Sequence, residues 1–318
     1  MRKSLIFAGL AVSVLALSGC ALGSTDSPEP TAGTATSGEL AGANVTVGSK
    51  EFTEQLILCE ITAQRLEAQG ATVKRICGMT GSATVRDAEV SGDIDTYWEY
   101  TGTGWISYLK HTEPIQNEEE QYTTVRDEDL AQNQIAWLPP AEANNTYAVA
   151  VKTETAKELG VTTLSEYAEL SQSNPAEATF CGASEFFGRN DGWPGLVEAY
   201  GISLPDSGVA TLAEGPIYDA VGKGDPCKFG EVFATDGRIA ALGLTVLEDD
   251  KSFFPYYNLS LTVRQEILDK HPAISETMAP VTELLTTQTL QDLNAQVDVD
   301  GKTPVAVASA WLSENNLN

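Results

Sequence analysis

The sequence predicts an α/β protein whose body folds into two similar lobes with a cleft between them. From residue 44, short apolar segments alternate with amphipathic helical segments, which is the order of βαβ units. The same alternation starts again after residue 146, and an apolar segment at 253–263 then predicts a strand that returns to the first lobe. Two lobes joined by two crossings make a cleft, and ligands of open α/β sheets bind at such boundaries.

The elements of the first lobe follow from the spacing of apolar residues and from glycines. Apolar side chains recur every three or four residues over 52–69, which predicts a helix with one buried face. Gly70 follows this helix, where a left-handed cap is common. The other predicted elements are strands at 45–47, 71–77, 93–100 and 135–138 and helices at 81–92 and 117–132. Their order predicts a largely parallel sheet.

The second lobe repeats this pattern. Its predicted strands are 146–152, 178–181, 228–235 and 244–247, and its predicted helices are 153–159, 165–171, 193–200 and 214–223. The last fifty or so residues read as helices that rejoin the first lobe. We therefore divide the body into lobe I, residues 44–147 and 255–318, and lobe II, residues 148–254.

The N-terminus has the pattern of a secretion signal. A basic MRK start precedes an apolar run of about thirteen residues, which is too short to span a membrane. The segment LSGC at 17–20 is typical of a bacterial lipoprotein signal, which predicts residues 1–19 as signal peptide and Cys20 as the lipidated residue. Residues 20–43 are rich in Gly, Ser, Thr, Pro and Ala and predict a flexible tether. We therefore predict a protein anchored by lipid to the extracytoplasmic side of the cell membrane. The alternative is an ordinary secretion signal that contains a cysteine by chance.

Four further cysteines, Cys59, Cys77, Cys181 and Cys227, are an even number in an oxidising compartment, which favours disulfides. Sequence alone allows three pairings, and four buried free thiols are the alternative. We favour Cys59–Cys77 and Cys181–Cys227 because each pair lies within one half of the chain.

The composition excludes some classes of function. A formal net charge of -26 argues against nucleic acid as a partner. The chain has no GxSxG or HExxH motif, its only histidines are His111 and His271, and its cysteines are too scattered for a zinc pattern. We expect no enzymatic activity, no cofactor and no metal.

Aromatic residues gather where predicted strands meet loops, which is where the cleft should lie. They are Tyr97, Trp98, Tyr100, Trp105, Tyr147, Phe233, Tyr256 and Tyr257. Core packing is the alternative for any one of them, and we interpret Tyr97, Trp98 and Tyr256 as packing residues.

Six segments carry a resemblance to a known family. GSKEFTEQ, DTYWEYTGTGW, NNTYAVAV, EFFGRNDGWPGL, FATDGRI and LEDDKSFFPYYN resemble, in order, the substrate-binding proteins of ABC importers for glycine betaine, choline and carnitine. The resemblance covers residues 44–318. It implies a type II periplasmic-binding-protein fold with a two-crossing hinge, a monomer, and an ABC permease and ATPase as partners. It also implies a quaternary ammonium ligand held by an aromatic box.

Carried over residue by residue, the resemblance places the box and a site for the ligand's carboxylate. The box would be Tyr100, Tyr147, Phe233 and Tyr257, and the carboxylate would meet Lys50, Thr103 and Arg189. Phe233 stands where the family usually has tyrosine. A trimethylammonium group has no N–H to donate, so aromatic faces bind it instead, at roughly 0.5–2 kcal/mol each. Glycine betaine is the first choice of ligand; choline, carnitine or ergothioneine are alternatives, and a secreted enzyme or a sensor domain on the same fold is a rival from another class.

Overall fold

The computed structural model describes residues 38–318. The predicted signal peptide, Cys20 and most of the predicted tether lie outside the described residues. Within 38–318, no helix is both long enough and apolar enough to cross a membrane.

The first lobe is built on a five-stranded sheet of order β2-β1-β3-β10-β4. Its strands are β1 (Asn44–Lys50), β2 (Thr72–Met79), β3 (Thr96–Tyr100), β4 (Ile135–Trp137) and β10 (Leu259–Arg264). Its helices are α1 (Thr53–Ala68), α2 (Ser82–Ser91), α3 (Thr101–Thr103), the π-helix η1 (Gly104–Tyr108), α4 (Glu118–Asn133), α11 (Gln265–Lys270), α12 (Ala273–Leu284), α13 (Thr287–Asp298) and α14 (Pro304–Glu314). The helix predicted at 52–69 is therefore α1, whose buried residues include Cys59, Ala63 and Leu66.

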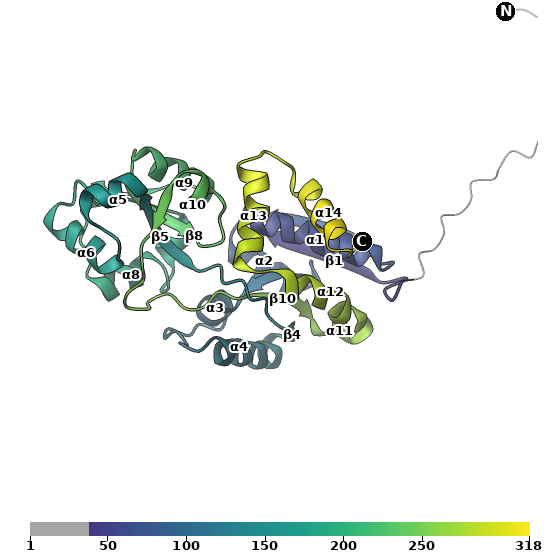
Figure 1. Cartoon of the computed structure of the whole chain (residues 1–318). Coiled ribbons are helices and arrows are strands. Elements are labelled where there is room, and N and C mark those ends of the chain that lie inside the picture. The colour runs from purple at the N-terminus through teal and green to yellow at the C-terminus, as the bar shows by residue number, and fades with distance from the viewer. Residues whose placement is uncertain (1–37) are drawn as a thin grey trace, which may run out of the picture. The chain divides into compact units, whose positions relative to one another are not determined.

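The second lobe is built on another five-stranded sheet, of order β7-β6-β8-β5-β9. Its strands are β5 (Tyr147–Lys152), β6 (Phe180–Gly182), β7 (Val209–Thr211), β8 (Phe229–Phe233) and β9 (Leu244–Val246). Its helices are α5 (Thr153–Leu159), α6 (Leu164–Ser173), α7 (Ser184–Gly188), α8 (Trp193–Tyr200), the short 3₁₀ helix η2 (Asp206–Gly208), α9 (Glu214–Lys223) and α10 (Arg238–Ala241). In Figure 1 the helices α5, α6, α8 and α9 surround β5 and β8.

The predicted largely parallel sheet is confirmed in the first lobe, where β2, β1, β3 and β4 run in one direction, but both sheets are mixed because each also contains one strand that opposes its neighbours. In the first, β1 is parallel to β2 and β3, whereas β10 is antiparallel to β3 and β4. In the second, β6 is parallel to β7 and β8, whereas β5 is antiparallel to β8 and β9. In each sheet the antiparallel strand is the one that follows a crossing from the other lobe, so it enters without the βαβ connection that enforces parallel direction.

The strand predicted at 253–263 begins only at Leu259. The preceding segment FFPYYN contains Pro255, which has no N–H to donate to a sheet ladder, and this segment forms the second crossing instead. The sequence prediction also missed the short elements α7, β7 and α10, because three to five residues are too few to show a hydrophobic period.

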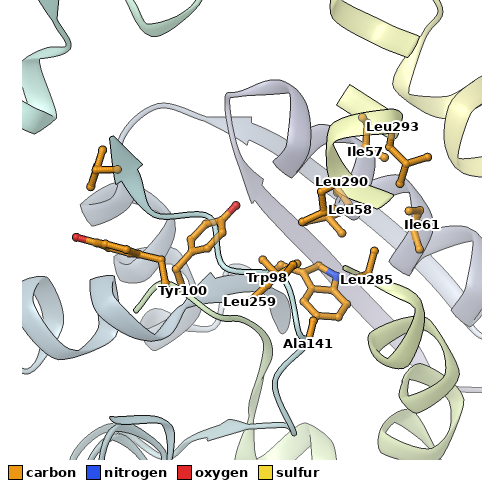
Figure 2. Packing of buried hydrophobic residues seen from close by; sticks show 14 of the residues in the cluster. Ile57, Leu58, Ile61, Trp98, Tyr100, Ala141, Leu259, Leu285, Leu290 and Leu293 are labelled. Atoms are coloured by element: carbon orange, nitrogen blue, oxygen red, sulfur yellow. The ribbon is translucent and has the colours of Figure 1, made fainter. Parts of the chain in front are cut away.

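The core of the first lobe joins the two ends of the described chain. The buried residues Ile57, Leu58 and Ile61 of α1 lie beside Leu290 and Leu293 of α13 (Figure 2). Helix α14, near the C-terminus, also packs along α1 (Figure 1). Packing of these late helices on α1 brings the chain back to the lobe in which it began.

Each lobe contains one disulfide that links two of its own segments. Cys59 is bonded to Cys77, from α1 to β2, and Cys181 to Cys227, beside β6 and β8. These are the two pairings that the sequence analysis favoured.

The chain crosses between the lobes twice, between β4 and β5 and between β9 and β10. The two crossings are joined to each other by hydrogen bonds. Asn144 and Asn258 form an antiparallel bridge, the Asn145 N–H donates to the Tyr257 carbonyl (3.1 Å), and the Tyr257 N–H donates to the Asn144 side chain (2.8 Å). The crossings therefore run side by side as one short ribbon next to the aromatic residues of the predicted box.

Candidate ligand-binding site

A small cavity of about 30 Å³ lies where the two lobes meet. Six of the seven predicted ligand-binding residues line it, and Arg189 does not. Its lining residues are Lys50, Glu51, Phe52, Ser82, Tyr100, Thr103, Asn145, Tyr147, Glu185, Glu214, Phe233 and Tyr257. The structure thus brings together residues that are up to about 200 positions apart in the chain, from both sheets and both crossings.

The aromatic rings around this cavity lie in contact. The Tyr147 ring is 5.3 Å from the Phe233 ring and 5.4 Å from the Tyr257 ring, the latter edge-on at 88°. Phe52, which the sequence prediction missed, stacks 5.2 Å from Phe233 and 6.3 Å from Tyr100. Phe52 stands inside GSKEFTEQ, but its position just before a helix gave no sign that its ring would join the others.

Strand register explains how these rings come together. Tyr147 and Phe233 are direct partners across β5 and β8, so they share one face of the second sheet. Tyr100 is the last residue of β3 and Tyr257 belongs to the second crossing. Gly102 makes room for Tyr257, because a Cβ atom at Gly102 would lie 2.7 Å from that ring.

The three tyrosine hydroxyls have different surroundings. The Tyr257 hydroxyl donates to the Asp191 carboxylate (2.6 Å), and the Tyr100 hydroxyl donates to Glu54 (2.7 Å) and accepts from the Gln55 amide (3.0 Å). The Tyr147 hydroxyl makes no hydrogen bond within residues 38–318. Burial raises the pKa of all three phenols well above the ordinary value, so each stays neutral at physiological pH.

Lys50 is buried and already has an anionic partner. Its ammonium lies 2.7 Å from Glu99 Oε1 and 5.0 Å from the centre of the Tyr100 ring. The other oxygen of Glu99 accepts hydrogen bonds from the Tyr97 and Tyr108 hydroxyls, at 2.8 and 2.5 Å. The sequence analysis missed Glu99 because it stands within the wholly buried strand β3, 49 residues from Lys50.

Arg189 is also buried and paired. Its guanidinium binds Asp191 through two hydrogen bonds, Nε to Oδ1 at 2.8 Å and Nη2 to Oδ2 at 2.5 Å. It also donates to Glu185 (3.0 Å), reaches the Thr103 hydroxyl (3.5 Å) and lies 5.3 Å from the Tyr147 ring centre. Arg189 therefore stands behind the cavity wall, where it holds Tyr257 through Asp191 and contacts Thr103.

Acidic side chains of the second lobe face the same region. Burial opposes ionisation of Glu185, but Lys50 and Arg189 outweigh it and hold the pKa of Glu185 below its ordinary value. Burial, together with Glu51 and Glu185, raises the pKa of Glu214 to about 7. Glu185 thus keeps a negative charge at the rim of the cavity, which attracts a cation, whereas Glu214 is only partly ionised near pH 7.

A larger cavity of about 580 Å³ adjoins the first and shares six lining residues with it: Glu51, Phe52, Asn145, Glu185, Glu214 and Phe233. It is lined further by residues of α1, α10 and α13, among them Glu54 and Asn294. The aromatic cavity and the larger one together form the cleft between the lobes.

Two mixed α/β sheets, a pair of crossings, and an aromatic-walled cleft with a negative rim define a bilobed solute-binding protein of the periplasmic-binding-protein class. The chain belongs to the family described as the substrate binding domain of ABC-type glycine betaine transport systems, which matches residues 43–314.

Individual relatives support the assignment of the chain to this family. The chain is 38% identical to a glycine-betaine-binding protein of Pseudomonas aeruginosa over 276 residues, 85% of this chain and 88% of that one. It is 33% identical to the glycine betaine-binding protein YehZ of Escherichia coli K12, over 86% of this chain and 91% of that one. Among solved structures, a glycine betaine/carnitine/choline ABC transporter protein superposes with a TM-score of 0.70 at 27% identity, over 86% of this chain and 99% of that one.

Proposed function

We propose that this protein captures a quaternary ammonium compound, glycine betaine first among them, and delivers it to an ABC permease and its ATPase. The observation that carries the proposal is the convergence of Tyr100, Tyr147, Phe233 and Tyr257 on one cavity between the lobes. Choline, carnitine and ergothioneine are the alternative ligands. We further propose that the chain acts as a binding protein and not as an enzyme.

The aromatic box would hold the ammonium group by its faces. Each desolvated face contributes roughly 0.5–2 kcal/mol, so the four rings together supply a few kcal/mol. Micromolar binding requires about 8 kcal/mol. Burial of the methyl groups and contacts at the other end of the ligand must provide the remainder, and Phe52 adds a fifth apolar wall.

We propose that Lys50 and Thr103 meet the ligand's carboxylate and that Arg189 supports them. An ammonium has three donors, and Lys50 uses one on Glu99, so two remain for a ligand. Thr103 lines the cavity with Lys50, and Arg189 lies behind it. Because Glu99 and Asp191 already balance the two cations, a ligand without a carboxylate loses hydrogen bonds but leaves no cation unpaired.

Calorimetric titration with glycine betaine, choline, carnitine and ergothioneine tests the proposal. Charge-assisted hydrogen bonds are worth roughly 1.5–3 kcal/mol, so the affinity for betaine should exceed the affinity for choline by a factor of about ten or more. Thr103→Val should reduce this preference, whereas Thr103→Ser, which keeps the hydroxyl, should retain it. Tighter binding of choline than of betaine would refute the carboxylate site, and binding of none of the four would refute the function.

Several remaining features complete the proposal. The protein would be a monomer, anchored by lipid on Cys20 to the extracytoplasmic side of the cell membrane. We place lobe I at residues 44–147 and 255–318 and lobe II at 148–254, with Tyr147, the first residue of β5, at the boundary. Ligand that contacts both lobes would stabilise their closed arrangement, which the permease would recognise.

A further inference from the structure

Glu54, in the first turn of α1, is a buried carboxylate that accepts four hydrogen bonds; its residue is 3% exposed. Its Oε1 accepts from the Tyr100 hydroxyl (2.7 Å) and the Asn145 amide (3.0 Å). Its Oε2 accepts from the Thr235 hydroxyl (2.5 Å) and the Asn294 amide (3.2 Å). Each oxygen thus takes one amide N–H and one hydroxyl.

The four donors come from segments that only the folded chain brings together. Tyr100 ends β3, Asn145 lies in the first crossing, and Asn294 lies on α13. Thr235 follows β8 and is the one donor from the second lobe. Asn145 and Asn294 also bind the Thr235 backbone, at its N–H (3.4 Å) and its carbonyl (2.9 Å).

We propose that Glu54 is a positioning residue that couples contact between the lobes to the orientation of the aromatic box. From the second lobe, Glu54 accepts a hydrogen bond from the Thr235 hydroxyl. From the first lobe, it accepts a hydrogen bond from the Tyr100 hydroxyl and so fixes the orientation of the Tyr100 ring. The effect on ligand affinity rests on the proposed function; the effect on the lobes does not.

The physical reason is the cost of burying a carboxylate with unfilled acceptor sites. If the second lobe moves away, Thr235 leaves with it, and Oε2 retains only the Asn294 donor. Glu54 lines the 580 Å³ cavity, so water can then reach the carboxylate and compete with the Tyr100 hydroxyl as a donor to it. A closed arrangement with all four donors is therefore also the arrangement in which Tyr100 is held most firmly.

Variants of Thr235 give the first test. Thr235→Val keeps the volume and removes the hydroxyl, whereas Thr235→Ser restores the hydroxyl and serves as the matched control. In small-angle X-ray scattering of the ligand-free protein, we expect the valine variant to have a larger radius of gyration than both wild type and the serine variant. We also expect it to bind glycine betaine about tenfold to a hundredfold more weakly, with recovery in the serine variant.

A double-mutant cycle tests the link to Tyr100. Thr235→Val and Tyr100→Phe remove donors from the same carboxylate, so their shifts in urea midpoint should be non-additive. Tyr167→Phe is the control partner, because its hydroxyl donates to the Ala178 carbonyl within the second lobe (3.0 Å), and its shift should add to that of Thr235→Val. Glu54→Gln should abolish the coupling, since a glutamine N–H₂ in place of either oxygen would face an asparagine N–H₂.

The outcomes separate the two proposals. If no ligand binds the wild type, the proposed function fails, and scattering together with the urea cycle still decides the role of Glu54. Equal scattering for Thr235→Val and Thr235→Ser, or additive shifts for Tyr100 and Thr235, would overturn that role even in a protein that binds betaine tightly.

Discussion

The three tyrosines of the box should respond unequally to the loss of a single oxygen atom. Tyr147→Phe removes a hydroxyl that has no hydrogen-bond partner within residues 38–318. Tyr257→Phe removes the donor to Asp191, and Tyr100→Phe removes the donor to Glu54. The same chemical change therefore has three different contexts, and the aromatic face is kept in each.

The expected magnitudes follow from these contacts. A hydrogen bond to a charged group is worth roughly 1.5–3 kcal/mol, so Tyr257→Phe and Tyr100→Phe should lower the free energy of unfolding by about that amount. Tyr147→Phe should change it by less than about 0.5 kcal/mol. Tyr147→Ala removes the face itself and should weaken ligand binding further, by at least the roughly 0.5–2 kcal/mol of one cation–π contact.

Urea unfolding of the ligand-free variants measures the first effect, and calorimetric titration with betaine measures the second. Tyr147→Phe should retain both stability and affinity, and Tyr147→Ala should lose affinity. A Tyr147→Phe variant as damaged as Tyr257→Phe would refute the argument from hydroxyl partners. Equal loss of affinity in Tyr147→Phe and Tyr147→Ala would show that the hydroxyl, and not the face, binds the ligand.

Three further predictions concern the lipidated cysteine, one disulfide and a buried glutamate. Cys20→Ala should release the protein from the membrane fraction; retention that still requires detergent would contradict lipidation. A non-reduced peptide map should join Cys181 to Cys227, and replacing both by alanine should cost roughly 4 kcal/mol of stability for a loop of this length; a crosslink from Cys181 to a first-lobe cysteine would disprove the pairing. Burial raises the pKa of Glu231 from 4.5 to about 8, so the unfolded chain ionises first and the native state loses stability as pH rises from 4.5 to 8. Glu231→Gln should remove that loss, on the order of a few kcal/mol at pH 8, and an unchanged pH dependence in urea unfolding would rule it out.

Local pattern predicted most elements of this fold, because a helix such as α1 shows its buried face over sixteen consecutive residues. Strand direction is not local. Whether β5 runs parallel or antiparallel to β8 depends on where the chain enters the sheet after crossing from the other lobe, and no short segment carries that information. The same holds for FFPYYN, whose aromatic composition suits a strand until Pro255 is considered.

In the site, too, features that depend on local sequence were predicted and features that depend on long-range contacts were not. Tyr100, Tyr147 and Phe233 stand at strand ends, where the sequence predicted the cleft, and the cavity unites them. The partners of the charged residues were not predicted. Nothing near Lys50 in the sequence indicated its ionic partner, because Glu99 lies 49 residues away in the buried strand β3, and such a long-range pair produces no local periodic pattern.

The ribbon formed by the two crossings has a mechanical consequence. Two independent linkers would let one lobe twist, slide and tilt against the other. Here Asn144 is bridged to Asn258 and the Asn145 N–H donates to the Tyr257 carbonyl, so a change in the backbone of one crossing would break hydrogen bonds to the other. We therefore expect relative motion of the lobes to be close to rotation about a single axis beside the Tyr257 ring. Fewer degrees of freedom would then be frozen when the lobes meet, so less of a ligand's binding energy would be consumed by ordering the chain.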